Sequence, residues 1–438
     1  MNFSKRNWGV LLLFGLIGQI AWAVENMYFN LFVFETIEPN LSAITLMVQL
    51  SGIAATFVTL VAGTLSDKVG NRRSFISFGY IIWGITVMLF GFIKPTLFAS
   101  LFGIDEAAAI KLCLATVIIG DCVMTLFGST SNDAAFSAWV TDNTESSYRG
   151  RVESVLAVLP LAAMLIVAGG FGILVSAIGY TFLFLSLGII ITASGVIGIF
   201  IIKDSEKLEK SGTLADIFYG FKPSVIKSNI PLYVILVITA IYGISCQIFM
   251  PYLIIYMKTF LGFSVIEYSA VFAIAIIAGA AINIYLGRLS DKMSKIRMIS
   301  LASLIFSVGL FGMFLANGMK HMTTIIIFGI ASFVMICGYI YISALSGAII
   351  RDHTPEGDVG KLQGVRMIFC VLIPMLIGPA VGNAINAAAN IPLENAGADA
   401  MTTLYIPSPA IFLAASITSL LIIAIAPVLD KVVTKTKK

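Results

Sequence analysis

Residues 63 to 68 read Gly-Thr-Leu-Ser-Asp-Lys, and residues 287 to 292 read Gly-Arg-Leu-Ser-Asp-Lys, so five of six positions are identical. Each copy ends an apolar stretch and is followed by further basic residues. A second echo relates the segment from Thr141 to Arg151 to the segment from Arg351 to Lys361. Self-similarity at a large, nearly constant offset indicates a duplicated unit. We therefore expect two structurally equivalent halves.

The composition around these repeats is that of a membrane protein. Hydrophobic residues make up 59% of the chain and charged residues only 11%, against about 25% charged residues in a soluble domain. Twelve apolar segments each reach the roughly 17 to 25 residues that a membrane-spanning helix needs. They predict an all-α integral membrane protein with twelve transmembrane helices, at residues 8–34, 41–64, 74–93, 109–133, 151–177, 180–202, 232–257, 265–287, 297–317, 322–350, 362–389 and 406–429.

The basic residues alternate between the two sides of these helices. Of the 27 Lys and Arg residues, only Lys94, Lys111, Lys258 and Lys320 fall on one side. Because positive charge accumulates in cytoplasmic loops, we expect both termini and the long middle loop in the cytoplasm. The location predicted for this multi-pass chain is a bacterial inner (plasma) membrane. The net charge is only +4, and the basic residues flank the predicted helices. Both features argue against a nucleic-acid partner.

The duplication divides the chain into two pseudo-symmetric bundles of six helices. We place the N-terminal bundle at 1–202, a cytoplasmic linker at 203–231, and the C-terminal bundle with its short basic tail at 232–438. Parallel halves of this kind are the architecture of rocker-type secondary transporters. The five cysteines lie inside predicted helices without paired spacing, so we expect neither disulfides nor a metal site. We also expect a monomer in the lipid bilayer.

The first repeat carries a family resemblance. Gly63-x-Leu-Ser-Asp67-Lys-x-Gly70-Asn71-Arg72 resembles the major facilitator superfamily signature G-x-L-a-D-r-x-G-r-k between the second and third helices. Asn71 replaces a basic residue, and the second copy lacks the second glycine. The stretches 142–151 and 352–366 are similar to the glycoside-pentoside-hexuronide and sucrose-type cation symporters. This resemblance implies the superfamily fold and alternating-access transport.

The signature predicts a latch at the cytoplasmic ends of the helices. A glycine at position 63 permits close approach of two helices, and Asp67 suits a neighbouring helix N-terminus. Basic residues of the loop are then expected to pair with carboxylates such as Asp142 or Glu145. The alternative is that these charges only anchor the topology. The predicted gate comprises Gly63, Asp67, Lys68, Arg72, Arg73, Asp142, Arg149, Asp291 and Asp352.

Candidate solute-binding residues lie on the first and seventh predicted helices. Trp22, Glu25, Asn26 and Phe29 follow helical spacing and are expected to share one face. An aromatic plane beside a carboxylate and an amide suits sugar recognition; the alternative is a core tryptophan with a polar neighbour tied to another helix. In the C-terminal half, Tyr242 and Gln247 are the matching candidates. A glutamine that only bridges helices is the alternative there.

Asp121, in the fourth helix, is the predicted cation-coupling residue, with Asp133 as a shallower second candidate. A low-dielectric surrounding disfavours the charged form of a carboxyl group, so the group takes up a proton or a neutralising Na⁺. The resembled symporters have acidic residues on their second and fourth helices. No carboxylate lies between Ser42 and Thr64 here, which favours a proton. The alternative is that Asp121 pairs permanently with a polar neighbour.

Together these features predict a cation-coupled secondary transporter of a small polar organic solute, a sugar or glycoside, with H⁺ or Na⁺ as coupling ion and no other cofactor. The main alternative is a proton-coupled exporter of hydrophobic compounds. Drug antiporters of the superfamily have a G-P-x-x-G-G element and a buried arginine that this N-terminal half lacks. An enzyme is not expected, because the sequence has two histidines and no H-E-x-x-H or nucleophile-elbow motif. A solute-binding receptor is a further alternative.

Overall fold

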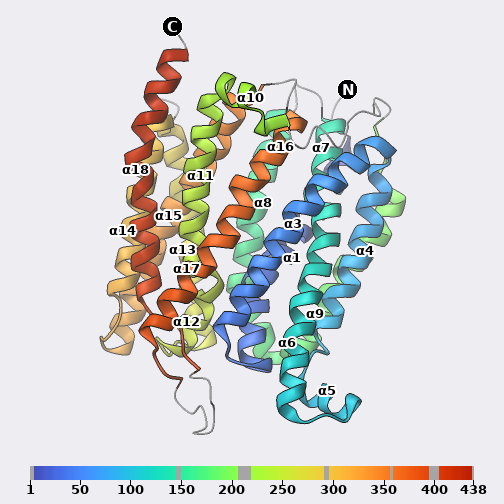
Figure 1. Cartoon of the computed structure of the whole chain (residues 1–438), viewed down its shortest axis with the longest axis vertical. Coiled ribbons are helices and arrows are strands. Elements are labelled where there is room, and N and C mark those ends of the chain that lie inside the picture. Colours follow the sequence, from blue (N-terminus) through green and yellow to red (C-terminus); the bar gives the residue numbers. More distant parts are fainter. Residues whose placement is uncertain are drawn as a thin grey trace. The chain divides into compact units, whose positions relative to one another are not determined.

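The computed structural model describes residues 4–144, 149–205, 219–290, 295–355, 359–393 and 404–436. Apart from one isolated bridge between Pro392 and Tyr405, these residues form helices and their connections (Figure 1). The chain divides into two compact units, Met1–Leu214 and Ala215–Lys438. The division falls inside the 203–231 stretch that the sequence predicts as a linker. The short helix α10 occupies Pro223–Ser228 within that stretch.

The first unit contains the helices of the N-terminal half. Their bounds are α1 Lys5–Val24, η1 Glu25–Phe29, α2 Asn30–Phe32, η2 Val33–Ile37, α3 Leu41–Val69, α4 Arg72–Phe90, α5 Pro95–Phe102, α6 Glu106–Gly128, η3 Ser129–Phe136, α7 Ser137–Asn143, α8 Arg149–Ile166, η4 Val167–Phe171 and α9 Gly172–Ile201. Helix α5 lies in a stretch that the sequence analysis treats as a loop. None of its residues is buried.

The second unit begins with α10 and contains the helices of the C-terminal half. The others are α11 Ile230–Phe249, η6 Met250–Tyr252, α12 Leu253–Thr259, α13 Val265–Ser290, α14 Lys295–Leu315, α15 His321–His353, α16 Val359–Met367, η8 Ile368–Leu372, α17 Ile373–Ala389 and α18 Ala410–Thr436. Within this unit α11, α17 and α18 run side by side (Figure 1).

The described residues contain twelve membrane-crossing segments. Eleven helical stretches are long and apolar enough to span a bilayer, and the one over Arg151–Ile201 has 51 residues, far more than one crossing needs. Gly179 divides it, with φ 73° and ψ 166°, a conformation that only glycine adopts easily. The predicted all-α, twelve-helix fold is confirmed, including the break between the fifth and sixth segments.

The two units repeat the same helix pairings. In the first, α1 packs on α8, α3 on α6, and α4 on α9. The second pairs α11 with α17, α13 with α15, and α14 with α18. Numbered along the chain, both halves therefore pair their first helix with the fifth, the second with the fourth, and the third with the sixth. The duplication seen in the sequence is a duplication of structure.

Several membrane helices are wound more loosely over one turn. Four such π-helical stretches lie in the first unit, at η1, η2, η3 and η4, and η8 lies in the second, as counted over the described residues. An extra residue per turn rotates the side chains that follow, and such insertions are frequent at functional sites. In this chain, η1 begins at Glu25 and η3 contains Asp133. Two of the five insertions therefore contain a predicted intramembrane acid.

Candidate functional site

Two buried carboxyl groups of the first unit meet around one serine. Glu25 of η1 is 8% exposed and Asp121 of α6 is 2% exposed. The Ser51 hydroxyl of α3 donates to Glu25 Oε1 at 3.0 Å, and the Thr125 hydroxyl of α6 donates to the same oxygen at 3.2 Å. Ser51 also interacts with the Asp121 carboxyl group, and the two carboxyl groups interact electrostatically. Three helices therefore bring two acids to one polar cluster.

Each acid of this cluster keeps one oxygen without a partner. Glu25 Oε2 and Asp121 Oδ1 are buried and accept no hydrogen bond from the described residues. Within the described part of the chain, no Lys, Arg or His forms an ion pair with either group. Two unneutralised carboxylates at such close quarters in a low-dielectric interior are strongly disfavoured. The two acids therefore share one polar cluster without a basic partner among the described residues.

A second polar cluster continues along the same helix. Asp121, Thr125, Ser129 and Asp133 follow one another at four-residue intervals through α6 and η3. The Ser129 hydroxyl donates to Asp133 Oδ2 at 2.9 Å, and the Asn132 amide donates to Asp133 Oδ1 at 3.2 Å. Asp133 also interacts electrostatically with Glu25. A continuous polar stripe thus joins all three predicted intramembrane acids.

The four residues predicted to share one face of the first helix have separate surroundings. Trp22 neighbours the Asp133 carboxyl group and packs on Trp83, with ring centroids 4.9 Å apart. Asn26 is exposed and donates to the Trp22 carbonyl at 2.8 Å. Phe29 is 1% exposed and stacks on Phe90 at 4.4 Å. Trp22, Glu25 and Phe29 nevertheless all contact α4 or α6, and a shared binding face of the four residues stays a prediction.

The candidates of the second unit lie in a mostly apolar surrounding. Tyr242 of α11 is 8% exposed and donates to the Tyr339 carbonyl at 3.0 Å. Its ring packs against Phe306 at 5.7 Å. Gln247 is partly buried, and its Cβ lies against Gly378 of α17. Tyr242 and Gln247 contact different neighbours, and their roles as solute ligands stay predictions.

The predicted latch of the first repeat forms an ion pair. Arg72 Nε lies 3.1 Å from Asp142 Oδ2, with side chains 6% and 26% exposed, and Arg72 Nη1 donates to the Ser66 hydroxyl at 2.5 Å. This contact between the signature loop and α7 is the pairing expected from the sequence. Gly70, with φ 68°, ends α3, and Asn71 caps α4 by accepting from the Ser74 N–H at 3.0 Å. The departure from a basic residue at Asn71 therefore has a local structural reason.

Other predicted gate residues behave differently. A Cβ on Gly63 would meet no atom within 4 Å, so the predicted close approach of helices there is wrong for this conformation. Lys68 is exposed, and Arg73 makes no ion pair with Asp142. In the second repeat Asp352 pairs with Lys295 at 2.6 Å, with side chains about half exposed. The predictions for Asp67, Arg149, Asp291 and Glu145 concern side chains outside the described part of the structure.

The hydroxyl groups of the site are not among the residues predicted from the sequence. Ser51 and Thr125 connect the acids, and Tyr80 donates to the Asn132 side chain at 2.9 Å. The four-residue spacing of Thr125 and Ser129 behind Asp121 is a readable signal for one polar face. Ser51 carries a weaker one, since isolated serines are common in membrane helices and mark helix contacts.

A family model agrees with the fold and the repeat. The model described as Major Facilitator Superfamily matches residues 11–379 and, in a second match, 235–438. The chain belongs to the major facilitator superfamily. A search of curated proteins found no matching relative. Membership makes this protein a transporter with membrane-spanning helices that acts on a small-molecule solute.

Solved structures of superfamily transporters share the fold at low identity. The nucleoside transporter NupG is 13% identical with a TM-score of 0.64, and the comparison covers 98% of this chain and 100% of that one. A variant of NupG has 11% identity, a TM-score of 0.68 and coverages of 96% and 99%. A bacterial homologue of the iron transporter ferroportin, in an outward-facing state, has 16% identity, a TM-score of 0.62 and coverages of 96% and 97%. These likenesses concern the fold.

Proposed function

We propose that this superfamily member couples the movement of a proton to the transport of a small polar organic solute of the saccharide or glycoside class, by alternating access. The observation that carries the proposal is the buried pair of Glu25 and Asp121 around Ser51, without a basic partner among the described residues. Ionisable groups inside a membrane protein mark ion and proton pathways by default.

The balance of charge supports a mobile proton. With both acids ionised, two negative charges face each other beside two hydroxyl groups, which cannot neutralise them. One bound proton leaves a single charge that Ser51 and Thr125 stabilise by hydrogen bonds to Glu25 Oε1. A second proton neutralises the pair. The number of protons bound therefore changes readily when water reaches the cluster, which is the property a coupling site needs.

The hydrogen bonds of Ser51 indicate which of the two acids carries the proton. A hydroxyl group donates one hydrogen bond and accepts up to two. Ser51 has one hydroxyl hydrogen, which it donates to Glu25 Oε1. Asp121 can then form a hydrogen bond with the same hydroxyl only as a protonated donor. The arrangement that follows is a chain from protonated Asp121 through Ser51 to ionised Glu25. Asp121 is then the proton carrier, and Glu25 belongs to the coupling cluster in addition to its predicted role in solute binding.

The latch connects this chemistry to a conformational change. Arg72 and Asp142 join the signature loop to α7, which continues from the helix bearing Asp121 through η3. A contact made in one conformation and broken in the other biases a two-state equilibrium. Protonation of the acid cluster removes negative charge from between helices that move during the conformational change. We therefore assign the latch to conformational control and the acids to coupling.

The assignment of the solute class relies on chemistry near the coupling cluster. Trp22 and the exposed amide of Asn26 supply an aromatic plane and hydrogen-bonding groups at the same end of η1. Nucleosides, the substrates named for the structural neighbour NupG, are glycosides and fit the class. Metal ions, named for another neighbour, are less favoured, since no group of three or more His, Cys, Asp and Glu among the described residues is placed to hold one.

The test uses purified protein in vesicles that enclose a pH-sensitive dye. Sugars, glycosides and nucleosides are added outside one at a time, with sodium absent and then present. We expect acidification of the lumen with one solute class and no need for sodium. Proton-independent uptake that requires sodium would replace the proton by Na⁺ at the same oxygens. Silence across the panel, with proton exchange driven by hydrophobic cations instead, would overturn the carbohydrate assignment in favour of the exporter.

A further inference from the structure

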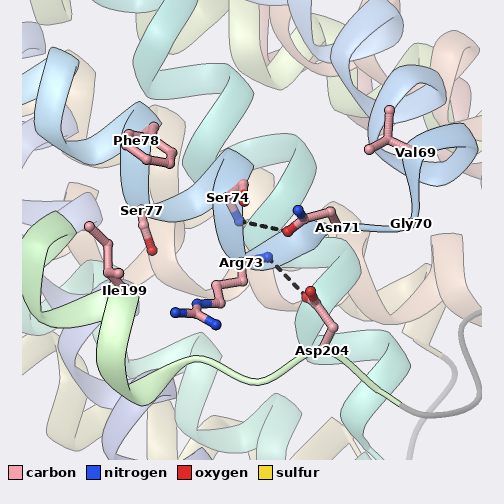
Figure 2. A pocket seen from close by; sticks show the side chains of 9 residues that line it. All are labelled: Val69, Gly70, Asn71, Arg73, Ser74, Ser77, Phe78, Ile199 and Asp204. Atoms are coloured by element: carbon pink, nitrogen blue, oxygen red, sulfur yellow. Dashed lines mark hydrogen bonds between the residues drawn. The ribbon is translucent and has the colours of Figure 1, made fainter.

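The two ends of α4 have different surroundings. At its start, the Arg73 backbone N–H donates to Asp204 Oδ1 at 2.9 Å, and both residues line a cavity of about 510 Å³ (Figure 2). A cation and a carboxylate share that wall, so the charges there are balanced within the protein. Beyond the other end of α4, the chain forms α5, and none of its eight residues is buried. The described part of the chain therefore leaves α5 uncovered.

Helix α5 has an apolar side and a polar side, and both are exposed. Leu97, Leu101 and Phe102 form the apolar side, and Leu101 and Phe102 are 66% and 60% exposed. Thr96 and Ser100 are one helical turn apart and form the polar side. Apolar side chains of this size are unfavourable in water, at about 25 cal/mol for each Å² of apolar surface. Helices with these two sides lie in the interface of a membrane.

The length of α5 and the charges beside it restrict its depth in a bilayer. Eight helical residues extend about 12 Å, far less than the roughly 30 Å of the hydrocarbon core, so α5 does not cross the membrane. Lys94 directly precedes α5, and the exposed residues Asp105 and Glu106 follow it closely. Charged groups are costly within hydrocarbon. The charges at both ends therefore hold α5 near the level of the lipid head groups.

The apolar side of α5 continues a surface that faces lipid. On the membrane-spanning helix α4, Leu89 is 58% exposed, and Phe92, between α4 and α5, is exposed as well. Helix α5 lies at the end of the first unit opposite the N-terminus (Figure 1). We propose that α5 binds the phospholipid surface of the leaflet at that end. Leu97, Leu101 and Phe102 lie among the upper parts of the acyl chains, and the polar side faces the head groups and water.

This attachment bears on the helix that carries Asp121. Gly103 ends α5 and donates its N–H to the Ala99 carbonyl, and α5 packs on α6. Helix α6 begins almost at once, where the Ala108 N–H donates to the Asp105 side chain at 2.7 Å. Because the connection is this short, binding of α5 to the membrane surface fixes the depth at which α6 begins.

The experiment places a fluorophore on each side of α5. Leu101→Trp adds an indole to the apolar side, and its matched control, Ser100→Trp, adds one to the polar side of the same turn. Purified protein in vesicles is mixed with phospholipids brominated at shallow or deep acyl positions, or with iodide on both sides of the membrane. The fluorescence of the wild type, which has four tryptophans, is subtracted. Phe102→Trp and Thr96→Trp repeat the comparison at a second pair of positions.

The pattern of quenching decides between lipid, water and protein. We expect shallow bromine to quench the added fluorescence of Leu101→Trp several-fold more than iodide does, and Ser100→Trp to show the reverse order. Stronger quenching of Leu101→Trp by deep bromine would overturn the interfacial position. Equal quenching of both variants by iodide would place α5 in water, and quenching of Leu101→Trp by neither reagent would indicate a protein cover, such as a second copy. Either result would overturn the proposal.

Discussion

The two halves share helix pairings but differ in what they bury. The first unit buries Glu25 and Asp121 within its helices, together with the polar stripe that ends at Asp133. Among the described residues of the second unit, the buried polar side chains are Ser, Thr and Asn, and none is a carboxylate. Since an unpaired acid in a membrane is costly, its presence on one side only indicates a function there.

The serines of the second unit have a structural use. Ser307 and Ser416 exchange hydrogen bonds between α14 and α18 at 2.7 to 3.1 Å, and Ser303 donates to the Ser419 carbonyl at 2.7 Å. Every one of these groups has a partner within the pair of helices. The equivalent pairing in the first unit, α4 with α9, contains no carboxylate. The duplicated architecture therefore repeats the packing, and a few positions of the first unit add the acids of the proposed coupling site.

The ion pairs beside the two copies of the repeated motif also differ in burial. Arg72 is buried and contacts both Asp142 and Ser66, whereas Lys295 and Asp352 form an exposed pair. Exposed ion pairs contribute about 0 to 1 kcal/mol to the free energy of unfolding. Removing one partner of a buried pair is strongly destabilising, because it leaves a buried charge without a partner. The first half thus contains the more tightly held latch as well as the acid cluster.

The largest expected effect comes from neutralising the acid pair. Asp121→Asn and Glu25→Gln should each lower solute accumulation driven by an imposed pH gradient by about 100-fold or more, equivalent to about 2.7 kcal/mol, because the proton has no site to occupy. The matched control is Glu267→Gln in the second unit, a partly exposed glutamate paired with His321. Radiolabelled solute uptake into vesicles measures all three. Accumulation at the wild-type level in both acid variants would remove the contrast between the halves.

The latches should differ in their effect on stability. Arg72→Gln should lower the free energy of unfolding by about 2 kcal/mol, less than for a fully buried pair because Asp142 keeps some exposure. Lys295→Gln should lower it by less than about 1 kcal/mol. Thermal unfolding of both variants in detergent makes the comparison. Equal losses would show that the two ion pairs contribute equally to stability.

Ser51 sharpens the account of the acid pair itself. Ser51→Ala removes the hydroxyl that lies between the two carboxyl groups and should slow proton-driven uptake about tenfold, or about 1.4 kcal/mol. Combined with Asp121→Asn, it should add almost nothing, because residues that act as a unit have non-additive effects. The uptake rates of the two single variants and the double variant form the test. Fully additive losses would separate Ser51 from the pair.

The smallest effect is expected from the serine contacts of the second unit. Ser307→Ala should lower stability by about 1 kcal/mol or less, as for other hydrogen bonds between membrane helices, and should leave proton-driven uptake unchanged. Thermal unfolding and vesicle uptake are measured on the same preparation. A loss of uptake without a loss of stability would give the second unit a share in coupling.

The sequence predicts the fold well because the signals behind it are additive. Three independent signals agree on twelve crossings: the lengths of the apolar segments, the alternation of basic residues and the two copies of the motif. A local irregularity in one helix does not change that prediction. The Arg72–Asp142 contact was also predictable, since Arg72 begins α4 and Asp142 lies near the end of α7, each within a segment that the repeat singles out. Asp121 was recognisable as an acid too deep in a helix to face lipid.

The geometry of the site was harder to predict, for local reasons. Glu25 accepts hydrogen bonds from Ser51 of α3 and Thr125 of α6. These partners come from other helices, and the periodicity of the first helix contains no information about them. The absence of an acid in the second helix favours a proton over sodium, but it does not predict which helix supplies a partner for Asp121. In the structure, the first helix supplies the second acid, and the second helix supplies the serine that links them.

The most direct test of the acid pair measures solute-dependent proton entry beside solute exchange, in wild type, Asp121→Asn and Glu267→Gln. If the buried acids of the first half carry the proton, Asp121→Asn keeps exchange of labelled for unlabelled solute but loses proton entry, while Glu267→Gln retains both. Proton entry in Asp121→Asn at the wild-type rate would contradict the account and return the buried acids to a structural role.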